Sequence, residues 1–191
     1  MSCAHNILLR MFGRPAGLLG RLGGVIMARV NGRIAAQVID LLAIRPRDKV
    51  LEIGFGPGVG VQALADRIGN GLVAGIDPSS EMVEQATARN RRAIEAHRVA
   101  LQCCSVDALP FADRTFDKAI AINSMQVWPD RDRGLREILR VLKPNGCVVL
   151  GFTTYSGQAR GGICESLTAA GFTAARIVAW DGTFCALAVR S

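Results

Sequence analysis

Glycines recur at every second position in one short segment, and the residues best suited to bind a ligand lie there. Gly54, Gly56 and Gly58 follow the strand-like run 50–53. Such a turn lets the backbone approach a ligand closely, because glycine has no Cβ and adopts positive φ readily. A helix that begins after the turn adds free N–H groups and a positive dipole end, which suit an anionic ligand group. The segment therefore predicts a ligand-binding loop between a buried strand and a helix.

The spacing of these glycines distinguishes between kinds of ligand. A dinucleotide-binding turn has the pattern G-x-G-x-x-G. Counted from Gly54 or Gly56, that pattern needs a third glycine at position 59 or 61, and both positions hold valine. The chain instead carries G-x-G-x-G, with Glu52 two residues before the first glycine. This departure disfavours a nicotinamide dinucleotide.

The pattern at 52–58 resembles the first motif of class I S-adenosylmethionine-dependent methyltransferases. Four further segments resemble later parts of that family, in the family's order. They correspond to a second strand ending in an acid, an adenine-site segment, a fourth strand, and a helix and turn before strand five, at 75–82, 105–111, 116–123 and 136–146. One glycine motif would be weak, but five segments over residues 48–155 are specific. The resemblance implies S-adenosylmethionine as cofactor and S-adenosylhomocysteine as product.

The resemblance assigns roles to several polar residues, each with a plainer alternative. Asp77 ends the second strand, where a carboxylate can accept hydrogen bonds from both ribose hydroxyls, or simply interact with a helix dipole. Asp107 would accept from the adenine amino group, or cap a turn. Asn123 would lie under the methionine part of the cofactor, and Glu52 would order the glycine loop or contact the cofactor's amino group. The complete set of expected cofactor contacts is Glu52, Gly54, Phe55, Gly56, Gly58, Asp77, Pro78, Ser79, Met82, Val106, Asp107, Ala108 and Asn123, of which Met82 has an equal claim to be a core residue.

Methyl transfer needs little covalent help, because the sulfonium is a good leaving group and the protein mainly aligns the reactants. The chain has no G-x-S-x-G motif and no Walker loop. It has six cysteines but no C-x-x-C and only two histidines, so we expect no metal site. No catalytic base can be assigned. The candidate acceptor contacts after strands four and five are Ser124, Gln126, Trp128 and Tyr155, although Trp128 could equally pack a helix.

The preferred interpretation is a methyltransferase for a small molecule, apolar or anionic, of the quinone- and lipid-related branch. Nucleic acid is disfavoured as substrate, because no cysteine follows a proline and strand four ends in residues 123–126 without the Asn/Asp-Pro-Pro-aromatic motif. A non-catalytic cofactor- or partner-binding module is the alternative, and an NAD-linked oxidoreductase is the third interpretation. The acceptor and the oligomeric state do not follow from the sequence.

The elements that must position these residues alternate between strand and helix. Apolar runs predict strands that end near 53, 76, 103, 122 and 152, with two more at 175–179 and 184–189. Helices are expected at 23–42, 61–68, 79–97 and around 163–170, with Ser79 as an N-cap. Alternation of this kind predicts an α/β fold, a Rossmann-like doubly wound sheet of seven strands covered on both faces. The resemblance implies that the sheet is mostly parallel, with an antiparallel last strand.

Length and charge divide the chain into a core and a basic N-terminal segment. The 191 residues suit one domain, and no apolar run of about 18 residues predicts a membrane-spanning helix. No convincing signal peptide begins the chain, so a cytoplasmic location is expected. Most of the net charge of +7 lies in residues 1–47, which hold seven arginines and only one acid. We expect 1–47 to form a helical cap over the methyltransferase core at 48–191, or to contact an acidic membrane, although a solvated basic helix face would look alike.

Overall fold

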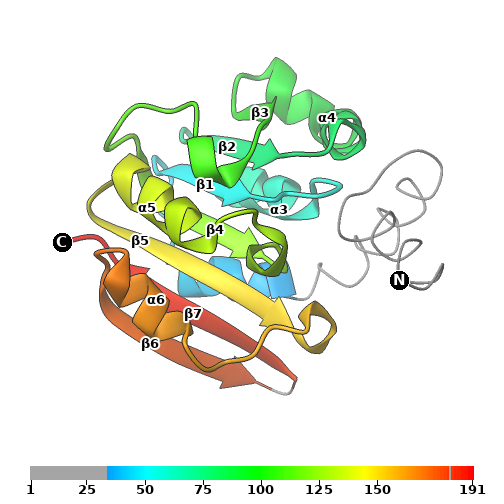
Figure 1. Ribbon diagram of the computed structural model, residues 1–191. Helices are drawn as coiled ribbons and strands as arrows, with labels where there is room; N and C mark the ends of the chain where they lie inside the picture. Colours follow the sequence, from blue (N-terminus) through cyan, green and yellow to red (C-terminus); the bar gives the residue numbers. More distant parts are fainter. Residues whose placement is uncertain (1–33, 181) are drawn as a thin grey trace, which may run out of the picture.

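A single mixed sheet organises the protein. The computed structural model describes residues 34–180 and 182–191. Its seven strands lie in the order β3-β2-β1-β4-β5-β7-β6 (Figure 1). Their bounds are β1 Lys49–Ile53, β2 Leu72–Asp77, β3 Val99–Cys103, β4 Phe116–Ile122, β5 Leu142–Thr153, β6 Thr173–Trp180 and β7 Thr183–Val189.

Strand directions confirm the expected mixture. β3, β2, β1, β4 and β5 run parallel to one another, whereas β7 is antiparallel to both β5 and β6. Parallel neighbours need a long crossover, which here contains a helix, whereas antiparallel neighbours can be joined by a hairpin. The closeness of β6 and β7 in sequence is therefore what permits the one reversed strand.

Helices cover both faces of the sheet, so the central strands are buried on both sides. α5 (Arg131–Val141) and α6 (Ile163–Ala169) pack over one face (Figure 1). The other face is covered by α3 (Val59–Arg67), α4 (Ser80–Glu95) and the helical residues 34–41. In β1, Leu51 belongs to one core and Val50 to the other, which explains why the sequence there is almost continuously apolar.

Some element boundaries differ from expectation. α3 begins two residues early, at Val59, because Gly58 adopts a left-handed conformation with φ 81° and ends the loop there. β5 begins at Leu142, inside the segment 136–146 where a helix and a turn were expected, and thus runs through Pro144–Gly146. A proline and a glycine predicted a turn there. The Ser79 cap is confirmed, since its hydroxyl accepts a hydrogen bond from the Met82 N–H at 3.4 Å.

The described part of the basic N-terminal segment belongs to the core. Ile34 and Val38 are buried in the helical residues 34–41. A Cβ built on Gly151 would lie 2.7 Å from the Val38 Cγ2, so this helix lies directly on β5. Residues 1–33, including the rest of the expected helix 23–42, lie outside the described residues. Among the helices that are described, none is both long and apolar enough to cross a bilayer.

Candidate functional site

The carboxyl ends of β1, β2 and β4 bring most of the predicted residues to one edge of the sheet. Ligands of open α/β sheets bind outside this edge. The Gly54 N–H donates to the Ile76 carbonyl at 2.8 Å, which joins the start of the glycine loop to the end of β2. The Ser124 hydroxyl donates to the Ile53 carbonyl at 2.9 Å, which joins the segment after β4 to the end of β1.

The loop needs its glycines for two separate reasons. Gly54, Gly56 and Gly58 have φ of 69°, 52° and 81°, a region that residues with a Cβ rarely adopt. Space is also limiting at the first and the last of them. A Cβ on Gly54 would lie 2.5 Å from the Ser124 Cβ, and one on Gly58 would lie 2.7 Å from the Ala86 Cβ. The loop can therefore lie close to both α4 and the β4 end.

Asp77 ties the glycine loop to the start of α4. Its Oδ2 accepts from the Gly56 N–H and its Oδ1 from the Ser79 N–H, both at 2.9 Å. Burial raises the pKa of Asp77, and the two backbone hydrogen bonds oppose that rise. Each carboxylate oxygen has a second lone pair. The ribose and helix-terminus interpretations are therefore compatible, because the carboxylate already serves the helix end and retains capacity to accept from a ligand hydroxyl.

Glu52 is the least satisfied polar group of the site. It is only 3% exposed, and its Oε2 has no hydrogen-bond partner among the described residues. Burial, and secondarily the charge of Asp77, raise the pKa of Glu52 to about 8. A buried carboxyl oxygen without a donor is costly. The position therefore suits a ligand that brings a donor or a positive charge, such as the ammonium group of an amino acid.

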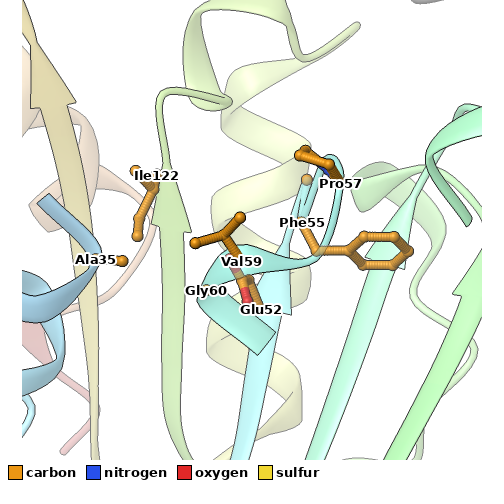
Figure 2. Close-up of a pocket in the computed structure, with 8 residues that line it drawn as sticks. Ala35, Glu52, Phe55, Pro57, Val59, Gly60 and Ile122 are labelled. Atoms are coloured by element: carbon orange, nitrogen blue, oxygen red, sulfur yellow. The ribbon is translucent and has the colours of Figure 1, made fainter. Parts of the chain in front are cut away.

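A narrow cavity lies beside Glu52. The space open to the centre of a water molecule is about 10 Å³, enough for about one water or a group of that size. Figure 2 shows the Val59 side chain on the same side as Ala35 and Ile122, whereas the Phe55 ring points away from them. The lining residues are Ala35, Glu52, Gly54, Phe55, Pro57, Val59, Gly60 and Ile122. The Phe55 side chain is buried, and its ring approaches Gly75, so Phe55 can meet a ligand here mainly through its backbone.

Gly60 belongs to the site although the glycine pattern did not point to it. A Cβ at Gly60 would overlap the Glu52 carboxylate. Gly60→Ala should therefore displace that carboxylate or the first turn of α3, and S-adenosylmethionine affinity should fall by about tenfold or more, the cost of a disturbed hydrogen bond to a charged group. Calorimetric titration of the variant would measure this. Gly161→Ala, where a Cβ meets nothing within 4 Å, is the control and should bind normally.

The residues expected around adenosine differ in their accessibility. Pro78 is exposed and Ser79 half-buried beside Asp77, whereas Met82 is 1% exposed, which favours its interpretation as a core residue. Val106 is also buried, and Ala108 is exposed. Asp107 is half-buried, and a hydrogen bond from Ser105, assisted by Arg133, holds its pKa below the ordinary value. Asp107 thus has a local partner, as the turn interpretation expects, and is still accessible to a ligand.

The segments after β4 and β5 are joined by Asn123. This residue has φ 49°, and its Oδ1 accepts from the Thr153 N–H at 2.9 Å. Its carbonyl accepts from the Gln126 side-chain amide at 2.7 Å. Asn123 therefore holds the ends of two strands in fixed relation at the place where the methionine part of the cofactor was expected.

Only two of the four acceptor candidates are exposed at this edge. Gln126 is exposed, and Tyr155 is 84% exposed in the turn after β5. Ser124 does not fit an acceptor role, because it is 7% exposed, bonded to the Ile53 carbonyl and pressed against Gly54. The Trp128 ring approaches Gly134 of α5, which supports helix packing. No cluster of three potential metal ligands occurs among the residues that the structure describes.

Comparison with known proteins decides the family. A family model described as a methyltransferase domain matches residues 50–146. The chain belongs to this methyltransferase family. It is 34% identical over 125 residues to YdaC of Bacillus subtilis, named an uncharacterized methyltransferase, which covers 65% of this chain and 67% of the relative. The ubiquinone/menaquinone biosynthesis C-methyltransferase UbiE of Geotalea daltonii is 34% identical over 106 residues, 55% of this chain and 45% of its own length.

A solved structure shows the same fold over nearly the whole chain. A SAM-dependent methyltransferase from Aquifex aeolicus superposes with a TM-score of 0.77 at 19% identity, covering 88% of this chain and 98% of its own. The cofactor of the class I methyltransferases, S-adenosylmethionine, fits the residues present here. Glu52 offers a buried acceptor without a donor, the glycine loop leaves room for close approach, and α3 begins without a side-chain cap.

Proposed function

We propose that this methyltransferase-family protein transfers the methyl group of S-adenosylmethionine to a small-molecule acceptor. The observation that best supports the proposal is the buried Glu52 oxygen without a partner, which lies beside a glycine loop and an uncapped helix end. A site that only packed the core would be expected to pair or exclude such a group. A cationic amino group from the cofactor would satisfy it.

The chain's own residues would bind and orient the cofactor. Glu52 would accept from the amino group, the N-terminal N–H groups of α3 would face the carboxylate, and Asp77 would accept from the ribose. Bound S-adenosylmethionine supplies an activated methyl group on a sulfonium. The protein's contribution is to hold that methyl in line with the acceptor's nucleophilic atom. We assign no general base for the acceptor among the residues described at this edge. The proposal therefore favours an acceptor that is itself a good nucleophile or that loses its proton to water.

The acceptor is proposed to be apolar or anionic, of the quinone or lipid kind. The relation to UbiE supports this class, as do the exposed Tyr155 and Gln126 beside the ends of β5 and β4. Methyl transfer from radiolabelled S-adenosylmethionine to extracted quinones, lipids and small phenols tests the proposal. Incorporation into one of these fractions supports it. Cofactor binding without transfer to any of them would favour the alternative, a non-catalytic cofactor-binding module.

Residues 1–33 are proposed to complete the acceptor side of the site. The described helix leads from Ile34 directly to the cavity, since Ala35 lines it beside Glu52. Removing residues 1–24 should therefore lower methyl transfer more than it lowers cofactor affinity, because a cap excludes water from the reacting groups. Parallel titrations and transfer assays on both lengths would measure this, and equal losses in the two would contradict a cap.

A further inference from the structure

Two consecutive residues of α4 donate hydrogen bonds to the glycine loop. The Arg89 Nε–H donates to the Pro57 carbonyl at 2.9 Å. The Asn90 Nδ2 donates to the Gly58 carbonyl at 3.1 Å. Each bond joins residues 32 positions apart in the sequence. Together they hold two successive carbonyl groups of the loop against the same helix. On its other side, the same loop is held by Asp77 at the Gly56 N–H.

Asn90 is an unusual residue for its position. Asparagine is a poor residue for a helix interior, because its amide competes for backbone hydrogen bonds. Asn90 is nevertheless 3% exposed within α4, and its Nδ2 donates also to the Ala86 carbonyl at 2.9 Å. Its Oδ1 is buried with no hydrogen-bond partner among the described residues. An apolar side chain of that size would avoid an unpaired acceptor, so packing alone does not explain an amide here.

The bond from Asn90 fixes the direction of the peptide that opens α3. The Gly58 carbonyl accepts from both Asn90 and the Gln62 N–H, the latter at 3.1 Å. No cis peptide occurs in the described chain, so the Val59 N–H points opposite to that carbonyl, out of the helix end. Because α3 has no side-chain cap, this N–H is one of the groups that the helix leaves for a ligand.

We propose that Arg89 and Asn90 are positioning residues for the cofactor. They hold the Pro57 and Gly58 carbonyls against α4, and thereby aim the first N–H groups of α3 at the cofactor's anionic end. Since α4 starts beside Asp77, one helix sets both this end and the ribose end of the site. Neither residue needs to touch the cofactor. The inference rests on the proposed cofactor site. It adds two residues that support the glycine loop from α4, and the family comparison assigns no role to either of them.

Asn90→Leu is the sharpest test, because leucine keeps the branching of the side chain while removing both the donor and the unpaired acceptor. We expect the dissociation constants of S-adenosylmethionine and S-adenosylhomocysteine to rise about tenfold, as for a lost hydrogen bond. A merely structural role predicts unchanged affinity with a lower melting temperature, and that result would overturn the proposal.

Arg89→Met keeps the test decisive if Asn90→Leu does not fold, since Arg89 is exposed and its stem is retained. It should also weaken binding, and unchanged affinity would contradict its positioning role. Arg91→Met is the matched control on the same helix, because the salt bridge of Arg91 within the described residues is to the exposed Glu95 at 3.7 Å, away from the glycine loop, and this variant should bind normally. Hydrogen exchange without cofactor separates this inference from the proposed function. The amides of 59–62 should exchange faster in Asn90→Leu than in the wild type, and equal rates would contradict the inference even if neither protein binds S-adenosylmethionine.

Discussion

Glu52→Gln should make the protein more stable above neutral pH while weakening its binding of S-adenosylmethionine. The pKa of Glu52 is raised from 4.5 to about 8, so the folded protein keeps a proton that the unfolded chain loses between these values. This contribution to stability is fully present below about pH 4.5 and is lost as the pH rises through about 8. Near pH 8 the variant should gain roughly 2–4 kcal/mol in free energy of unfolding, at about 1.4 kcal/mol per pKa unit.

Urea denaturation of the wild type and variant between pH 4 and 9 would measure this effect. The wild type should lose stability with rising pH over the window from 4.5 to 8, and Glu52→Gln should lack that component. Glu84→Gln, on the exposed side of α4, is the control and should keep the wild-type slope. Identical slopes in wild type and Glu52→Gln would show that Glu52 titrates normally.

The same substitution should lower cofactor affinity by about ten- to a hundredfold, because it removes the charge that would balance the amino group. Binding to the wild type below pH 8 should also release a proton, since the bound ammonium favours ionised Glu52. Calorimetry in two buffers with different ionisation enthalpies would detect that release. Its persistence in Glu52→Gln would assign the proton to another group.

Asp77→Ala should weaken S-adenosylmethionine and S-adenosylhomocysteine binding equally, by roughly 1–3 kcal/mol. The ribose is common to both ligands, and the substitution also frees the Gly56 N–H that Asp77 holds at 2.9 Å. Parallel titrations would compare the two ligands, with the exposed Asp66→Ala as control. A loss confined to one ligand would contradict a role at the ribose.

Local sequence patterns predicted the parts of the fold that depend on local physics. Glycine adopts positive φ most readily, so the repeated glycines at 54–58 pointed to a loop, and the apolar strand ending at Asp77 before a capping Ser79 marked the end of β2. The long β5 was missed because Pro144 and Gly146 normally end a strand, whereas here the Asn145 N–H pairs with the Arg190 carbonyl at 2.7 Å. That partner lies 45 positions away and cannot be found from neighbouring residues.

The sequence pointed to residues that the structure brings to one edge of the sheet, but long-range contacts decide what several of them can do. Ser124 follows strand four as an acceptor contact would, but its hydroxyl turns inward to Ile53. Arg89 and Asn90 act on a loop 32 residues earlier in the chain. An asparagine within a helical pattern was a visible signal, yet only the packing of α4 on the loop shows what its amide bonds. Gly60 likewise needed the position of the Glu52 carboxylate.

Calorimetric titration of the full chain with S-adenosylmethionine, S-adenosylhomocysteine and NAD tests the central claim most directly. We expect one site that binds both S-adenosylmethionine and S-adenosylhomocysteine, and no binding of NAD. Glu52→Gln should weaken the binding of S-adenosylmethionine. Binding of NAD without binding of S-adenosylmethionine, or S-adenosylmethionine binding that Glu52→Gln leaves unchanged, would contradict the assignment of this site.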